Sequence, residues 1–351
     1  MLRITGYSDK YSVCPGDNMK FYVNSEHNES YDAHAVRLIH GDTNPDGPGY
    51  KEEELAFSCN GNYAGRNQRI HGGSYVIVPQ DERLNVKSFT IQAYIFPTTP
   101  EKGRQGIITK WVESNKSGYG LFVDDDSCLS LEIGDGNGMV MNLSSGKKLM
   151  RKVWYLVAAT FDEHTGRVTL YQEPVVSRTN GGLGMSMLHP ADETTALVEA
   201  TNSMCPGVND APLLMAATTL EERTGRTIFG AHYREALSPV ELPEQTNVYN
   251  GKIDRPRLCR RALSKAEIEA LARGFQGCPA DLRYDVVGAW DFHNNITTNV
   301  ATTYIIDTSP NVLNGHIINM PVRGMTGFNW TGDEITYHHK PEEYGAIHFH
   351  D

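Results

Sequence analysis

The chain has 351 residues, which is enough for two domains and for a sizeable hydrophobic core. Its formal net charge of −11 gives no long-range attraction to nucleic acid or to an anionic membrane, so neither is expected as a partner. No apolar run is long enough to cross a membrane, and the first ten residues lack the apolar stretch and cleavage site of a secretory signal.

The six cysteines are widely spaced and contain no CxxC pair: Cys14, Cys59, Cys128, Cys205, Cys259 and Cys278. This pattern predicts buried thiols in a reducing compartment and not a disulfide framework. We therefore expect a cytoplasmic protein.

The first 55 residues predict a small antiparallel β unit that resembles an immunoglobulin-like sandwich. Alternating apolar and polar residues predict strands at 18–23 and 33–39. The stretch 41–49 is too rich in Gly, Pro, Asp and Asn for regular structure.

From residue 75 onward, short alternating segments separated by turn signals are typical of a β-sandwich or barrel. We expect strands at 75–78, 89–96, 107–111, 121–123, 129–133, 139–143, 153–161 and 168–171. The odd positions Phe89, Ile91, Ala93 and Ile95 share one face of their strand, so they are predicted to face the core. The loop 162–166 predicts a five-residue hairpin connection.

A long insertion is predicted at 181–248, where methionines stand among Gly, Thr and Pro and one strand is expected at 213–217. One short helix is expected from Ser264 to Arg273, since Ser264 and Glu267 have the spacing of a capping box and Gly274 follows the last turn.

The tail begins with an expected strand at 286–292 and stops at 346–351, apparently inside another strand. A strand cut at its end leaves backbone groups unpaired, so we expect the natural polypeptide to continue or another chain to complete this edge. The predicted domains are 1–55, 56–285 with the insertion 181–248, and 286–351, whose strands complete the sandwich or start the next domain.

One histidine-rich region offers possible metal ligands, namely His338, His339, His348 and His350, with Glu343 and Asp351 as the nearby carboxylates. Because no cysteine accompanies them, we favour solvated or interfacial histidines over a metal site.

Two acidic loops, 124–126 and 135–138, carry oxygen ligands that calcium prefers, but they lack the spacing of a known calcium loop, so hairpin turns are the favoured interpretation. The segment 134–138 has no lysine and no following helix, which excludes a phosphate loop. No Gly-x-Ser-x-Gly element is present, and 117–120 is interpreted as a turn leading into a strand. No catalytic residue is therefore predicted within this chain.

Five blocks, in order, resemble laminin-G-like (concanavalin A-like) jelly-roll domains: 73–79, 88–97, 154–162, 249–254 and 261–264. The pattern typical of the first strand of such domains is similar to 288–292 followed by 306–311 and 314–315. It stands here after the helix, so the tail is expected to fill the place of the first strand or to begin another sandwich.

Further segments resemble the large (β) subunit family of N,N-dimethylformamidase: 37–42, 47–53, 250–256, 321–327 and Asn329 with Trp330. The resemblance implies the N-terminal half of such a subunit. It implies an enzyme that hydrolyses dimethylformamide to dimethylamine and formate with a mononuclear iron held by tyrosines and a glutamate. Those ligands are expected beyond Asp351, so no iron ligand is assigned to this chain.

The sequence is thus interpreted as the non-catalytic N-terminal part of an amide hydrolase that serves assembly and supports an iron centre located elsewhere. The expected partners are the catalytic half or neighbouring subunits of a homo-oligomer, with a small subunit possible. The alternative is a free-standing module that binds carbohydrate or protein, because a fold alone does not determine function.

Overall fold

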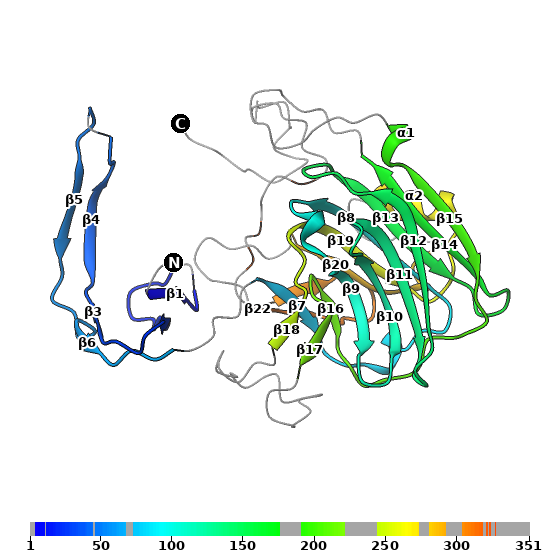
Figure 1. Ribbon diagram of the computed structural model, residues 1–351, viewed down its shortest axis with the longest axis horizontal. Helices are drawn as coiled ribbons and strands as arrows, with labels where there is room; N and C mark the ends of the chain where they lie inside the picture. Colours follow the sequence, from blue (N-terminus) through cyan, green and yellow to red (C-terminus); the bar gives the residue numbers. More distant parts are fainter. Residues whose placement is uncertain are drawn as a thin grey trace. The chain divides into compact units, whose positions relative to one another are not determined.

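The computed structural model of the protein describes residues 4–10, 12–44, 46–67, 73–175, 191–221, 244–273, 281–292 and 304–318, with the single residues Pro321, Arg323 and Gly327. The chain divides into two compact units (Figure 1). The first unit comprises Met1–Gly72 and Asn299–Ala301, and the second comprises Gly73–Thr298 and Thr302–Asp351. No helix in the described part of the chain is both long and apolar enough to cross a membrane.

All strands among the described residues of the first unit pair in antiparallel ladders. It contains three two-stranded ladders: β1 (Ile4–Ser8) with β2 (Phe21–Ser25), β3 (Tyr31–Ala33) with β6 (Gly61–Tyr63), and β4 (Val36–Gly41) with β5 (Tyr50–Glu54). Tyrosine pairs lie across two of these ladders, with ring centroids 5.1 Å apart for Tyr7 and Tyr22 and 5.8 Å apart for Tyr31 and Tyr63.

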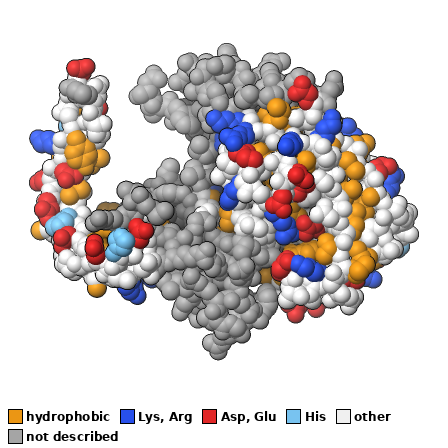
Figure 2. Space-filling view, in the orientation of Figure 1, with side chains coloured by type: hydrophobic (Ala, Val, Ile, Leu, Met, Phe, Trp, Pro, Cys, Tyr) orange, Lys and Arg blue, Asp and Glu red, His pale blue; other side chains and the backbone are white. Residues whose placement is uncertain are grey.

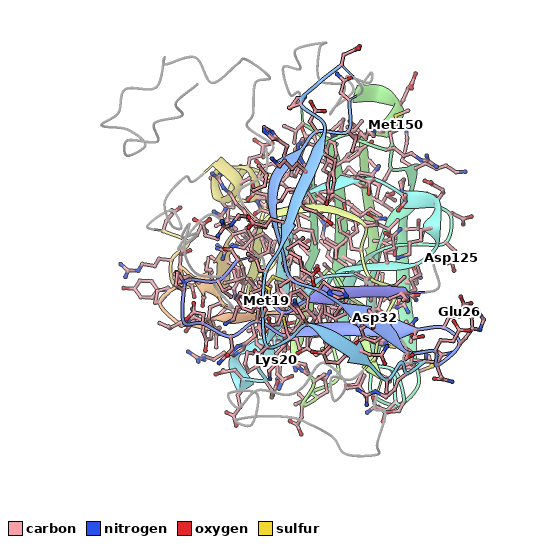
Figure 3. All side chains as sticks on the ribbon, turned by 90° about the vertical axis from the view of Figure 1, so that its left-hand side faces the viewer. Met19, Lys20, Glu26, Asp32, Asp125 and Met150 are labelled. Atoms are coloured by element: carbon pink, nitrogen blue, oxygen red, sulfur yellow. The ribbon has the colours of Figure 1, made fainter. Side chains whose placement is uncertain are left out.

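These three ladders differ from the expected immunoglobulin-like sandwich, which requires two sheets packed on a shared core. Ser25 is the one fully buried residue among those described in this unit, and Phe21 is 70% exposed although its strand alternates as predicted. Alternation predicts a strand, but it does not supply a second sheet to cover the apolar face. Side chains of this unit, such as Asp32 on β3, are drawn in Figure 3.

The second unit is built on a continuous 14-stranded sheet whose two halves enclose one core. The β9 half runs in the order β12 (Val140–Lys148), β11 (Cys128–Asp135), β10 (Ser117–Val123), β9 (Gln105–Val112), β16 (Leu213–Met215), β7 (Tyr75–Val78), β22 (Gly315–Ile318) and β21 (Tyr304–Asp307). The β8 half continues through β20 (Val286–Asp291), β19 (Gly251–Cys259), β8 (Phe89–Pro97), β13 (Tyr155–Phe161), β14 (Arg167–Pro174) and β15 (Ala196–Thr201). The expected all-β sandwich is confirmed.

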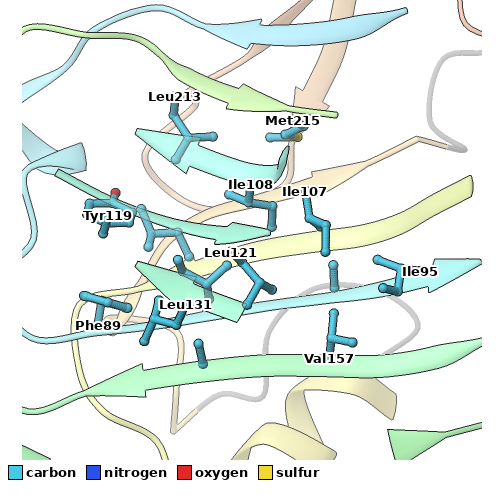
Figure 4. Packing of buried hydrophobic residues seen from close by; sticks show 14 of the residues in the cluster. Phe89, Ile95, Ile107, Ile108, Tyr119, Leu121, Leu131, Val157, Leu213 and Met215 are labelled. Atoms are coloured by element: carbon cyan, nitrogen blue, oxygen red, sulfur yellow. The ribbon is translucent and has the colours of Figure 1, made fainter. Parts of the chain in front are cut away.

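Apolar side chains from both halves interdigitate in the core (Figure 4). Phe89, Ile91, Ala93 and Ile95 are all fully buried in this cluster, as their alternation predicts. Burying a side chain of this size stabilises the fold by ~1.5–3 kcal/mol. The predicted core-facing side of β8 is therefore confirmed.

The opposite face of β8 is buried as well, because a helix covers it. Helix α2 (Lys265–Arg273) packs Ile268 and Leu271 onto this side of the β8 half. The capping box that begins α2 is formed: the backbone N of Ser264 donates to Glu267 Oε2 at 2.8 Å, and the backbone N of Glu267 donates to Ser264 Oγ at 3.4 Å. Gly274, the predicted helix stop, lies outside the described residues.

The described tail strands lie within this same sheet. β20 pairs with β19 and β22 pairs with β7, so β20 to β22 link the two halves of the sandwich. Trp290 is 1% exposed, and its Nε1 donates to the carbonyl of Leu313 at 2.7 Å. The carboxylate of Asp307 accepts backbone hydrogen bonds from Ala289 and Leu313. These contacts explain why the motif at 288–292 and 306–311 occurs as a unit.

The described part of the insertion contains more regular structure than the one expected strand. The strand expected at 213–217 is present as β16, but β15 was not predicted and forms an edge of the sheet beside β14. A one-turn helix, α1 (Ala191–Thr194), precedes β15, and β17 (Thr219–Glu221) pairs with β18 (Glu244–Thr246). Among the methionines of this segment, Met215 is in the core, whereas Met185 and Met187 lie outside the described residues.

Two local predictions have mixed outcomes. The hairpin at 162–166 joins β13 to β14, and Gly166 has the expected positive φ of 70°. The cysteine prediction is only partly right, since Cys128 and Cys259 are buried but Cys14, Cys59 and Cys205 are exposed. The spacing of cysteines argues against disulfides, but it does not determine their burial.

Candidate functional site

The predicted histidine cluster and its carboxylates, His338, His339, His348, His350, Glu343 and Asp351, lie outside the described residues. Within the described part of the chain, no three His, Cys, Asp or Glu side chains are placed to hold a metal ion together.

The acidic loop 124–126 joins β10 to β11, and its carboxylates accept hydrogen bonds from the protein itself. Asp124 Oδ1 accepts from the backbone N of Asp126 at 3.0 Å and of Cys128 at 2.7 Å, and its Oδ2 accepts from Ser144 Oγ at 2.7 Å. Asp125, labelled in Figure 3, accepts from the backbone N of Arg104 at 2.9 Å. These are the contacts of a side-chain-stabilised turn.

The second acidic loop has the same arrangement. Asp135 Oδ1 accepts from the backbone N of Asn137 at 2.7 Å and of Met139 at 3.1 Å, and these hydrogen bonds lower the pKa of the Asp135 carboxyl. The turn interpretation accounts for this loop. The neighbouring segment 117–120 is not a turn, because it forms the beginning of strand β10.

The described residues bring one charged and aromatic cluster together on the outer face of β9, β10 and β11. Trp111 donates its Nε1 hydrogen to Glu113 Oε2 at 2.8 Å. The indole lies against Gly134 of β11, where a Cβ atom would stand 2.8 Å from Trp111 Cη2 and 2.1 Å from the carbonyl oxygen of Lys116. A glycine is therefore required beneath the ring.

The second aromatic ring of this cluster is that of Phe122, and Arg104 covers it. Phe122 is fully buried, and the Arg104 guanidinium lies 4.2 Å from the centroid of its ring. The same guanidinium donates to Glu132 Oε2 at 2.5 Å. This arrangement combines a cation–π contact with a charge-assisted hydrogen bond.

The pKa values of the two glutamates of the cluster, Glu113 and Glu132, are shifted in opposite directions. Burial raises the pKa of Glu132 against the attraction of Arg104. Burial also tends to raise the pKa of Glu113, but hydrogen bonds from Lys116 and Trp111 outweigh this effect, so the pKa of Glu113 is lowered. Opposite shifts are typical of acid–base pairs. Both carboxylates already accept hydrogen bonds within the cluster, which is the arrangement of a structural ion-pair network.

A buried cation lies on the inner side of β9. Lys110 is fully buried, and its Nζ donates to Gln80 Oε1 at 2.9 Å, to the carbonyl of Asn209 at 2.9 Å and to the carbonyl of Ala211 at 2.7 Å. Burial lowers the pKa of Lys110 to about 8, against a smaller upward effect of Asp210. Its contacts tie the segment before β16 to the sandwich.

Three core tyrosines are poorly suited to an iron site of the kind that the resemblance implies. Tyrosine binds iron as a phenolate, and burial in an apolar core disfavours that charged form. Burial raises the pKa of Tyr119, Tyr155 and Tyr249. The hydroxyl of Tyr119 donates to the carbonyl of Leu84 at 2.8 Å, and the hydroxyl of Tyr155 accepts from the backbone N of Met150 at 3.0 Å. These phenols are held protonated by the core.

Comparison with known proteins agrees with this architecture. Residues 71–193 match the family described as the concanavalin A-like lectin/glucanases superfamily. The complete chain is 37% identical over 355 residues to the N,N-dimethylformamidase β subunit of Paracoccus aminophilus, and 36% identical to that of an Alcaligenes species. The chain is thus similar over its complete length to two N,N-dimethylformamidase β subunits. It spans 43% of the length of each of these relatives.

Solved structures are similar only at a low level. The CBM40 of the Ruminococcus gnavus IT-sialidase is 14% identical, with a TM-score of 0.34, and the match covers 53% of this chain and 82% of that one. A similarity this weak bears on neither the fold nor a ligand.

Sequence reasoning missed both Lys110 and the pair of Arg104 with Glu132. The available signal was a lysine inside an apolar strand, since Lys110 stands between Ile108 and Trp111 in a segment that is otherwise buried. Charged residues are rarely buried unless they are paired. The pairing itself was not predictable, because Asn209 and Ala211 are about 100 residues away in the chain.

Proposed function

We propose that this chain is a non-catalytic part of an amide hydrolase of the N,N-dimethylformamidase type. In this proposal it corresponds to the N-terminal part of the β subunit, it serves assembly, and it supports an iron centre held by residues outside this chain. The observation that carries the proposal is the similarity over the complete chain to two dimethylformamidase β subunits of which the chain spans 43%.

The geometry of the described residues supports this division of roles. The core tyrosines are held protonated, and the carboxylates of the acidic loops accept hydrogen bonds within their own turns. The sandwich, whose two halves share one core, is therefore proposed to act as a support. Iron in the complete enzyme would supply Lewis-acid activation of water for attack on the amide carbonyl.

The isolated 351-residue chain tests the proposal. It is titrated with ferric iron while visible absorption is recorded, because iron bound by phenolates absorbs in that range, and dimethylamine release from dimethylformamide is measured in parallel. We expect no stoichiometric absorption band and no amine above the buffer control. A band that saturates at one iron per chain, together with amine release, would overturn the proposal.

The rival function is a free-standing carbohydrate-binding module, which is favoured by the family match of residues 71–193. Isothermal titration of the isolated chain with a panel of soluble oligosaccharides separates the two functions. Saturable binding of one oligosaccharide by a chain that is monomeric in its native source would favour the rival.

A further inference from the structure

Strands β4 and β5 form a two-stranded ribbon, which we call the arm (Figure 1). Every residue of Val36–Gly41 and Tyr50–Glu54 is exposed. An isolated two-stranded ribbon is only marginally stable in water and needs packing on at least one face. Within the described residues of the first unit, neither face of the arm is covered.

The register of the arm separates its two faces. Val36 pairs with Glu54 and Leu38 pairs with Glu52, so these four side chains share one face with Tyr50. Val36 is 43% exposed, Leu38 56% and Tyr50 57%, which gives this face an apolar strip in water. Hydrophobic side chains are visible on the arm in Figure 2.

The opposite face carries polar and charged side chains. Arg37 pairs with Glu53 and His40 with Lys51 across the ladder, after a bulge between Leu38 and His40. The Arg37 Nη1 to Glu53 Oε2 distance is 3.8 Å, so the acid on this face already has a cation of its own. The arm is thus apolar on one face and polar on the other, except for Ile39, which stands at the bulge and is 43% exposed.

The acids that border the apolar strip have weaker partners. Glu52 Oε2 accepts from the hydroxyl of Tyr50 at 2.6 Å, and Glu54 Oε1 lies 2.8 Å from His34 Nδ1. Neither contact supplies the permanent charge of lysine or arginine. A surface that covers the strip and neutralises its border must therefore present apolar side chains beside lysine or arginine.

We propose that the apolar face of the arm, formed by Val36, Leu38, Tyr50, Glu52 and Glu54, docks onto a basic and apolar surface of the polypeptide that carries the catalytic site. This inference rests on the proposed function, which places that site outside the chain. The chain spans 43% of the length of its relatives, so an enzyme of that length contains further polypeptide that could present such a surface. A second copy of this chain is a poorer occupant, because its net charge of −11 and its own glutamate border oppose the approach.

Hydrogen exchange locates the contact. The native assembly is purified through an affinity tag on this chain, and amide exchange across 36–54 is compared with that of the isolated chain. We expect exchange in the arm to be at least ~10-fold slower in the assembly, because a covered ribbon opens less often. Equally fast exchange in both samples would overturn the proposal.

Charge reversal tests the chemistry of the partner. The double variant Glu52→Lys/Glu54→Lys and the variant Leu38→Asp should each reduce recovery in the assembly at least ~10-fold, as expected for central interface positions. Lys51→Glu, on the polar face, is the matched control and should assemble normally. Raised salt should weaken assembly of the native chain. Variants that assemble like the native chain, or an assembly in which only a second copy of this chain protects the arm, would refute the proposed partner.

Activity of the same preparation separates this inference from the proposed function. An assembly that hydrolyses dimethylformamide while its arm exchanges freely refutes the docking surface alone. An assembly that protects the arm with a basic polypeptide but releases no amine refutes the enzymatic role and the catalytic nature of the partner, and leaves only the docking of the arm onto a basic surface standing. Unchanged thermal unfolding of the isolated variants excludes misfolding as the cause of either result.

Discussion

Phe89→Ala is the perturbation that tests the packing of the sandwich most sharply. Phe89 is fully buried, and its ring centroid lies 5.0 Å from that of Tyr119 and 5.9 Å from that of Phe161. Truncation removes a large apolar side chain and leaves a cavity between the two halves of the sheet, which costs ~3–5 kcal/mol. Loss of the two ring contacts, each worth ~0.5–1.5 kcal/mol, places the value in the upper part of that range.

Urea unfolding followed by tryptophan fluorescence measures this cost. The described tryptophans, Trp111, Trp154 and Trp290, all belong to the second unit, so the signal reports on the sandwich. Leu197→Ala on β15 is the matched control, because Leu197 is 59% exposed and its truncation should cost little. A loss below ~1 kcal/mol for Phe89→Ala would mean that β8 does not face the core as described.

Two further predictions concern titrating groups in the second unit. Burial lowers the pKa of Lys110 to about 8 from the ordinary value of 10.5, so the unfolded chain binds the extra proton between these values. The unfolding free energy of the native chain relative to Lys110→Met should therefore rise as the pH increases from about 8 to 10.5. Lys87→Met is the control, because Lys87 is exposed. A difference that does not change with pH would contradict the burial of the Lys110 ammonium group. Glu267, whose pKa the Arg261 hydrogen bond holds at about 2, stabilises the protein above its ordinary pKa of 4.5. The advantage of the native chain over Glu267→Gln in chemical unfolding should be lost as the pH falls from about 4.5 to about 2, and a persistent advantage below that range would refute the role of the charge.

The sandwich was predictable where one local signal determined each feature. The alternation from Phe89 to Ile95 identifies the core face of β8 without reference to any other strand. The Ser264 and Glu267 spacing locates the beginning of α2, because the capping box is formed by residues three apart. The glycine of the 162–166 hairpin likewise determines its own turn.

Features that depend on distant partners were not predictable. Apolar and polar residues alternate in the first unit as they do in the strands of a sandwich. Phe21 is nevertheless exposed, because the described residues of this unit form separate ladders. The cluster of Arg104 with Glu132 and Phe122 requires the register of β9, β10 and β11, which a single sequence does not specify. Acidic loops whose carboxylates bind their own backbone are indistinguishable by composition from calcium loops.

The proposed role of this chain is that of a non-catalytic part of an amide hydrolase. Its most direct test is dimethylamine release from dimethylformamide, measured at equal concentrations of the native assembly and of the isolated 351-residue chain, both supplied with iron. We predict release by the assembly and none above the buffer control by the isolated chain. Equal release by both samples would place the catalytic centre within this chain and contradict the claim.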